Sequence, residues 1–146
     1  MRFWDRPGPL TAETPRLTRE GPRTGETDRA AGRPYRYAYN VTGVPGAFLF
    51  DGLVKHDLQT GREEHYALGA GVYGSETVLA PRNGSASEDD GYLVTFVSDL
   101  PNDRSECWIF SAQTVADGPI ARVRLPERIA SGTHACWAPA SALQGW

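Results

Sequence analysis

Short apolar runs separated by turn residues recur along most of the chain, and this spacing restricts the fold more than any other feature. The runs begin at Tyr35 with the alternating text YRYAYNV and continue to Pro126. Polar clusters such as NGSASEDDG, residues 83–91, separate them. No run keeps a helical period, whereas short strands at regular intervals are typical of sandwiches, barrels and propellers. We therefore expect an all-β chain.

The predicted strands fall into two successive groups. The segments YLVTFVSD, CWIFSAQ and IARVRLP follow one another closely, as adjacent antiparallel strands of a propeller blade do. The earlier segments YRYAY, FLFDGLVKHDL and REEHYAL have a similar order. We therefore expect about two blades, the second made mainly of residues 91–138. Because two blades cannot close a ring, each leaves a face that normally packs against a neighbour.

The segment before these strands is irregular. Residues 1–34 hold many of the prolines and glycines and several arginines, with no strand or helix period. A long segment of this kind is functional, disordered, or packed against something outside the chain. We therefore divide the chain into an irregular segment, residues 1–34, and β-blades over residues 35–146.

Composition excludes several classes of protein. The 146 residues carry a net charge of −3, which gives no basic face for nucleic acid. No apolar run is long enough to span a membrane, and the start MRFWDRPGPL lacks the apolar region of a secretory signal. Cys107 and Cys136 lie in apolar text, so we expect two buried free thiols in a reducing compartment, with the cytoplasm as the default location.

Two of the three histidines lie on one predicted hairpin, KHDLQTGREEH. If its loop is residues 59–61, with Gly61 in the left-handed conformation, Leu58 pairs with Arg62 and His56 with Glu64. His56 and His65 then face opposite sides and cannot share a metal. A shift of one residue would bring them to the same face. We interpret both as ordinary histidines at the surface of a sheet.

Four other polar sites are candidates for function. The acidic run at residues 88–90 does not match the spacing of a calcium loop, so we interpret it as a solvated turn. Glu76 begins the strand text SETVLAPR and faces either a cavity or solvent, and Glu13 in AETPRL is equally open. His134 lies in apolar text, where a histidine is either a hydrogen-bonded core residue or a metal ligand.

Taken in order, these segments resemble the C-terminal part of the carotenoid cleavage oxygenases. That family includes bacterial lignostilbene dioxygenases and the retinal-forming and retinoid-isomerising enzymes of animals. The resemblance covers most of the chain and rests on ETPRL, GRPYRYAY, LVKHDLQTG, SETVLAPR, EDDGYLVTFVSD, SECWIFSA and PIARVRLPERIASGTH. It implies a seven-bladed β-propeller, of which this chain would hold about two blades. It also implies an axial iron(II) ion held by four histidines, three of whose imidazoles donate hydrogen bonds to three glutamates.

On this resemblance, His134 is the last of the four iron ligands, and Glu76 and Glu13 are two of the three glutamates. Neutral imidazoles suit ferrous iron, and a carboxylate on the far ring nitrogen fixes the tautomer and ring angle. The implied reaction uses O2 to cleave a carbon–carbon double bond of a carotenoid, apocarotenoid or stilbene to two carbonyl products. Because one imidazole leaves most of the coordination sphere to water, we do not expect this chain alone to hold iron tightly.

The chain also departs from the family pattern. The family usually has Pro-x-Gly-Phe-His-Gly at the last ligand, whereas Thr133 here replaces the aromatic residue and Ala135 the final glycine. The other three iron histidines and one glutamate are missing, and neither His56 nor His65 falls at a ligand position. We therefore interpret the chain as a fragment: a truncated product, a wrongly assigned start or a degraded paralogue. Two alternatives are a non-catalytic β-module for binding or assembly, and one half of a split enzyme whose partner is an N-terminal propeller half.

Overall fold

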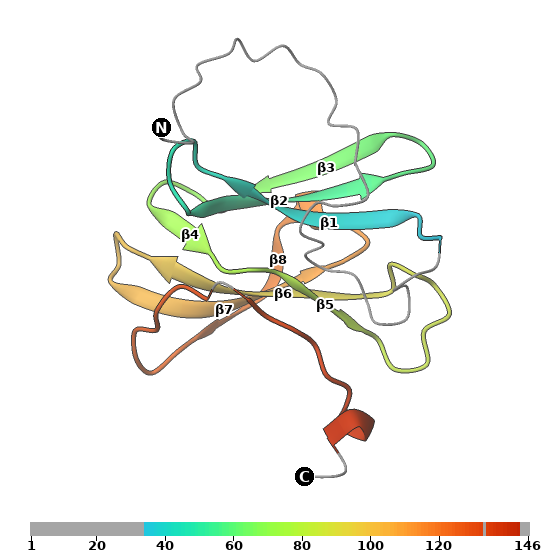
Figure 1. Cartoon of the computed structure of the whole chain (residues 1–146). Coiled ribbons are helices and arrows are strands. Elements are labelled where there is room, and N and C mark those ends of the chain that lie inside the picture. Colours follow the sequence, from blue (N-terminus) through green and yellow to red (C-terminus); the bar gives the residue numbers. More distant parts are fainter. Residues whose placement is uncertain (1–33, 133, 144–146) are drawn as a thin grey trace, which may run out of the picture.

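The computed structural model describes residues 34–132 and 134–143, so the expected irregular segment at residues 1–34 lies almost entirely outside it (Figure 1). Within these ranges the chain forms strands and two short 3-10 helices, and no helix there is long and apolar enough to cross a membrane. The elements are β1 (Tyr37–Gly43), β2 (Phe50–Asp57), β3 (Arg62–Ala67), β4 (Val72–Gly74), β5 (Val78–Pro81), β6 (Gly91–Asp99), β7 (Arg104–Ser111), η1 (Val115–Asp117), β8 (Pro119–Arg124) and η2 (Ala140–Leu143). The expectation of an all-β chain is confirmed.

The strands join one antiparallel sheet of eight strands. Its main order is β1-β2-β4-β6-β7-β8, with β3 also paired to β2 and β5 to β6. Figure 1 shows this sheet folded into two layers, with β1–β3 in one and β5–β7 in the other. The short strand β4 connects them, because Gly74 pairs with both Phe50 of β2 and Val97 of β6.

The second group of strands begins and ends earlier than the sequence suggested. β5 pairs with β6 from Val78↔Val94 to Pro81↔Gly91, so the group includes strands that precede residue 91. Its last strand, β8, ends at Arg124, and no strand follows it within the described residues. The expected range of 91–138 is therefore wrong at both ends, although the meander β6-β7-β8 forms as predicted.

The core takes side chains from both layers. Along β6, Leu93, Thr95 and Val97 are buried and Phe96 is 44% exposed, which is the alternation of a sheet with two different faces. Leu53 of β2 and Phe110 of β7 belong to the same hydrophobic cluster as Leu93 and Val97. Burying a side chain of this size contributes about 1.5–3 kcal/mol, so this cluster holds the two layers together.

The β2–β3 hairpin has a register one residue away from the predicted one. Asp57 pairs with Arg62, so the loop contains four residues and Leu58 lies in it. The Asp57 carboxylate accepts the N–H groups of residues 59 and 60, and Leu58 donates its own N–H to Arg36 rather than to the hairpin. Gly61 has a positive φ of 71°, as predicted. The predicted pairs Leu58–Arg62 and His56–Glu64 are wrong.

This register brings the two hairpin histidines to the same face. His56 pairs with Glu63, and His65 lies two residues further along β3. His56 Nδ1 is 2.9 Å from Glu63 Oε1, and His65 Nε2 is 2.9 Å from Glu63 Oε2. The hydrogen bond with His65 lowers the pKa of the Glu63 carboxyl. Burial opposes this shift, and the charge of His56 adds to it. One carboxylate therefore bridges both imidazoles.

The acidic turn at residues 88–90 is not simply solvated, as its sequence suggested. Glu88 accepts the backbone N–H groups of residues 36 and 37, at the start of β1. Asp89 pairs with Lys55, whose side chain is only 6% exposed. Asp90 forms an ion pair with an arginine at the end of β5. The turn therefore ties β5 and β6 to the layer that contains β1 and β2.

The two cysteines are free thiols, as predicted. The prediction that both are buried is wrong. Cys107 on β7 is half-buried and Cys136 is exposed. Burial raises the pKa of the Cys107 thiol. The sequence expectation treated both thiols alike, whereas only Cys107 belongs to a strand.

Candidate metal site at Glu76 and His134

Glu76 lies in the short connection between β4 and β5, which neighbouring hydrogen bonds fix to β6. Ser75 donates its N–H to the Phe96 carbonyl and accepts the Phe96 N–H at its Oγ. Thr95 Oγ1 donates to the Ser75 carbonyl at 3.1 Å. Because both sides of Ser75 are held, the backbone next to Glu76 has a fixed path. The Glu76 side chain is only 15% exposed, so of the two readings left open by the sequence, the structure shows a largely buried carboxylate.

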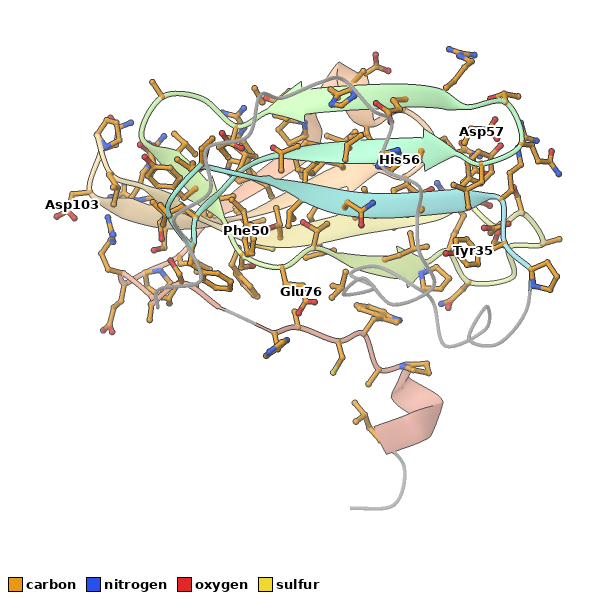
Figure 2. The ribbon with its side chains drawn as sticks, turned by 45° about the horizontal axis from the view of Figure 1, so that its top comes forward. Tyr35, Phe50, His56, Asp57, Glu76 and Asp103 are labelled. Carbon is orange, nitrogen blue, oxygen red and sulfur yellow. The ribbon has the colours of Figure 1, made fainter. Side chains whose placement is uncertain are left out.

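His134 reaches this carboxylate from a distant part of the sequence. It lies in an irregular segment well after β8, not at the end of a strand, and its side chain is 93% exposed. Its Nδ1 is 3.6 Å from Glu76 Oε2. The same oxygen accepts the backbone N–H of Ala135 at 2.6 Å. Figure 2 shows Glu76 directed from the sheet toward this C-terminal segment.

The arrangement fixes the carboxylate more firmly than the ring. The Ala135 N–H is a short donor to an anionic oxygen, and such charge-assisted hydrogen bonds are the strong ones. The distance of 3.6 Å from Glu76 to His134 is longer than a hydrogen bond, so a small ring movement would complete one. With Nδ1 turned toward Glu76, Nε2 has no hydrogen-bond partner among the described residues.

These two residues fit part of an iron site and not a whole one. Imidazole nitrogen is a suitable ligand for iron, and a carboxylate on the other ring nitrogen is the usual support for a metal-bound histidine. Among the described residues, however, no group of three or more histidines, cysteines or acidic residues is placed to hold a metal. The remaining ligands would have to come from elsewhere.

The remaining residues considered from the sequence either lie outside the described residues or are found elsewhere in the fold. Glu13 lies outside the described residues, as does Thr133. His56 and His65 form their own cluster with Glu63 on the β2–β3 hairpin. The structure therefore brings together Glu76 and His134, and leaves the assignment of Glu13 a prediction.

Sequence reasoning missed the polar residues that flank Glu76. Ser75 and Thr77 are each 3% exposed, and the Thr77 hydroxyl has no hydrogen-bond partner among the described residues. The text SETV alternates, which places both hydroxyl residues on the face opposite Glu76 if the segment is extended. That alternation was the available signal for a buried polar support.

Comparison with known proteins identifies the class. The family described as retinal pigment epithelial membrane protein (RPE65) matches residues 9–139. The chain therefore belongs to this family, the carotenoid cleavage oxygenases. The family resemblance stated from the sequence is confirmed.

Individual relatives agree with this assignment. The chain is 32% identical over 126 residues to lignostilbene-alpha,beta-dioxygenase isozyme III of Sphingomonas paucimobilis, which covers 79% of the chain and 26% of the relative. It is 36% identical over 126 residues to the carotenoid 9,10(9',10')-cleavage dioxygenase of Crocus sativus, which covers 77% of the chain and 23% of the relative.

Solved structures show the same partial match. The lignostilbene dioxygenase of Pseudomonas brassicacearum matches with a TM-score of 0.68 and 31% identity, over 74% of this chain and 25% of that one. The cobalt-substituted Synechocystis ACO matches with a TM-score of 0.69 and 30% identity, over 75% and 23%. The fold is therefore part of the β-propeller of these oxygenases, and the chain spans about a quarter of the length of the relatives it matches.

Proposed function

We propose that this chain supplies one corner of an iron(II) site, with His134 as a metal ligand and Glu76 as the residue that orients it. The complete enzyme would be a dioxygenase that cleaves a carbon–carbon double bond of a carotenoid, apocarotenoid or stilbene to two carbonyl products. The observation that carries the proposal is the position of Glu76 Oε2, between the Ala135 N–H and the His134 ring. Membership in the oxygenase family supports the choice of metal and reaction.

Each residue has a separate role in this proposal. In this role Glu76 accepts a hydrogen bond from the N–H at His134 Nδ1, which keeps the proton on Nδ1 and leaves Nε2 as the unprotonated nitrogen that a metal requires. The Ala135 N–H holds the carboxylate while the ring adjusts. Iron, when bound, would supply the open positions at which dioxygen reacts with the substrate.

The chain needs a partner for this function. One imidazole, even with a supporting carboxylate beside it, does not bind iron tightly, because metal affinity rises with the number of preorganised ligands. The other three histidines implied by the family would come from the rest of the propeller. We expect O2 and a polyene or stilbene substrate only for that complete assembly.

A non-catalytic module for binding or assembly is the second candidate. The observation in its favour is the high exposure of the His134 side chain, 93%, in a chain whose described residues hold no metal cluster. The two candidates differ in one measurable property. Only the first requires that His134 changes the iron content of the complete assembly.

The test combines this chain with a polypeptide that carries the rest of a related propeller. Iron content is measured by mass spectrometry, and cleavage of a stilbene and of a carotenoid by product analysis. We expect iron and cleavage in the assembly, and loss of both in the variant His134→Ala. The matched control is His65→Ala, which removes an exposed histidine from the hairpin and should change neither. Full iron content in the His134→Ala assembly would contradict the proposal.

A further inference from the structure

A threonine in the core of the second layer keeps a hydroxyl where its neighbours on the same face are aliphatic. Thr95 lies on β6 between Leu93 and Val97, and all three side chains are 1% exposed. A valine would fill the same space without a polar atom, and a buried hydroxyl is costly unless it is hydrogen-bonded. The Thr95 hydroxyl therefore indicates a specific partner.

That partner is the peptide group that precedes Glu76. Thr95 Oγ1 donates to the Ser75 carbonyl at 3.1 Å, across 20 positions of sequence. The Ser75 carbonyl belongs to the same planar peptide unit as the Glu76 N–H. The bond from Thr95 therefore restrains the whole peptide unit on the N-terminal side of the Glu76 Cα.

The peptide group that follows Glu76 is held by a second hydroxyl. Ser75 Oγ donates to the Glu76 carbonyl at 3.0 Å. The same Oγ accepts the Phe96 N–H at 3.1 Å, and a hydroxyl has a single proton to donate. Thr95 thus donates its proton on one side of Glu76, and Ser75 donates its proton on the other.

These two hydrogen bonds determine where the Glu76 side chain starts. The backbone has only two soft torsions at each residue, and here the peptide units on both sides of the Glu76 Cα are tied to β6. The Cα–Cβ bond is therefore held in one direction. It directs the carboxylate toward the C-terminal segment (Figure 2), where Oε2 meets the Ala135 N–H and the His134 ring.

Thr77 is a buried threonine beside Glu76 that lacks such a contact. Its side chain is 3% exposed, and its hydroxyl has no hydrogen-bond partner among the described residues. Thr77 and Thr95 are therefore alike in residue type and burial, and they differ in whether the hydroxyl holds the backbone at Glu76. This difference makes Thr77 a matched control for Thr95.

We propose that Thr95 is a positioning residue for the Glu76 carboxylate. Its hydroxyl acts through the Ser75 carbonyl and, together with Ser75 Oγ, directs Glu76 at the Ala135 N–H and the His134 ring. Its consequence for metal binding rests on the proposed function, in which His134 is a ligand. The positioning itself needs no metal, so it can be measured in the isolated chain.

The test uses the metal-free chain, and its readout is the Ala135 amide. NMR of the isotope-labelled chain measures the chemical shift of this N–H, which a short bond to a carboxylate moves downfield, and its rate of exchange with solvent. Thr95→Val keeps the shape of the side chain and removes the hydroxyl. We expect the Ala135 amide proton to move upfield and to exchange about fivefold faster, the ratio that corresponds to one typical hydrogen bond. Thr95→Ser restores the hydroxyl and should recover both values.

Two further variants make the test specific. Ser75→Ala removes the donor to the Glu76 carbonyl and should shift the Ala135 amide in the same direction as Thr95→Val. Thr77→Val removes a hydroxyl that has no partner among the described residues and should leave this amide unchanged. An unchanged Ala135 amide in both Thr95→Val and Ser75→Ala would overturn the proposal. So would an equal change in Thr77→Val, or a Thr95→Ser chain that behaves like Thr95→Val.

The complete assembly separates this inference from the proposed function. In it, Thr95→Val should lower iron affinity by up to about tenfold, the smaller effect of losing a residue that supports a metal ligand. Full iron content in the His134→Ala assembly would contradict the proposed function without changing the Ala135 result in the metal-free chain. An unchanged Ala135 amide would contradict the positioning role of Thr95 whatever the iron content.

Discussion

Lys55 and Asp89 form a largely buried ion pair that connects the two layers of the sheet. Lys55 Nζ lies 3.0 Å from Asp89 Oδ2, and the two side chains are 6% and 13% exposed. The same ammonium donates to the Gln113 carbonyl and lies 4.4 Å from the centre of the Tyr37 ring. The charge of Lys55 is therefore compensated by groups from three different segments, and Asp89 is the only anion among them.

Removing Asp89 should destabilise the chain strongly. The variant Asp89→Ala leaves the buried ammonium of Lys55 without its counter-ion, which typically costs about 3–5 kcal/mol. The carbonyl and ring contacts should keep the loss near the lower end of that range. The measurement is urea unfolding followed by fluorescence. Asp90→Ala is the matched control: its pair with Arg82 is more exposed, at 28% and 55%, and such pairs contribute less than about 1 kcal/mol. Equal losses in the two variants would contradict this account of Lys55.

Stability should fall in acid. Hydrogen bonds from Arg36 lower the pKa of Asp57 well below its usual 3.8, against the opposing effect of burial. The pKa of Asp89 is also lowered. Burial raises this pKa, but hydrogen bonds from Ser87 and Lys55 outweigh that effect. A lowered folded-state pKa contributes stability above the unfolded value and loses it as the pH falls below that value.

We therefore expect the free energy of unfolding to decrease steadily below about pH 4 as Asp57 and Asp89 lose their charge. Urea titrations at a series of pH values measure this. Asp57→Asn removes the titrating group, so its loss between pH 5 and pH 3 should be smaller than that of the unchanged chain. A flat profile down to pH 3 would be inconsistent with the lowered pKa values.

Gly118 should tolerate no side chain. Its backbone has φ 85° and ψ −173°, a conformation that is essentially restricted to glycine. A Cβ there would also lie 2.8 Å from Tyr66 Cε2, whose ring packs edge-on against Phe110. Gly118→Ala should therefore lower the free energy of unfolding by more than about 2 kcal/mol.

Gly84→Ala is the control for Gly118→Ala. Gly84 also has a positive φ, 77°, but a Cβ there meets nothing within 4 Å. Its cost should be limited to backbone strain of about 1 kcal/mol. Thermal unfolding of the two variants under the same conditions separates the cost of backbone strain, present in both, from the cost of the contact with Tyr66, present only in Gly118→Ala. Equal melting temperatures would show that the Tyr66 ring moves aside at no cost.

The exchange Glu76→Gln tests the role proposed for the carboxylate. Glutamine keeps an acceptor for the Ala135 N–H but cannot hold a negative charge beside His134. In the complete assembly, we expect iron affinity to fall by about 10–100-fold, which is the usual effect of losing a residue that supports a metal ligand. Metal titration with a competing chelator measures it. Glu63→Gln is the matched control on the hairpin and should leave iron affinity unchanged.

The strands could be predicted from local text, but their register could not. The alternation in residues 91–99 and 104–111 is sufficient to identify β6 and β7. The β2–β3 register depends on the Asp57 side chain and on the bond from Leu58 to Arg36, which lies outside the hairpin. A period-two pattern with charged residues on both faces gives no signal against a shift of one residue.

The candidate site was predictable only in part. Glu76 lies 59 positions before Ala135, so no local pattern connects it with His134. The family resemblance alone assigned both residues to the iron site, and it did not pair them with each other. The partners of the acidic residues in the turn at 88–90 could not be predicted for the same reason. Glu88, for example, contacts a residue 52 positions away in the sequence. Local text shows that an acid is in a turn, but not which distant donor it faces.

The contact from Ala135 to Glu76 also bears on how this position can change during evolution. The donor is the main-chain N–H, so the anchor of the carboxylate does not depend on the side chain at residue 135. The alanine found where the family pattern has glycine therefore keeps the hydrogen bond. Proline is the single amino acid that would remove the donor. Any replacement at residue 135 other than proline therefore keeps the donor beside His134.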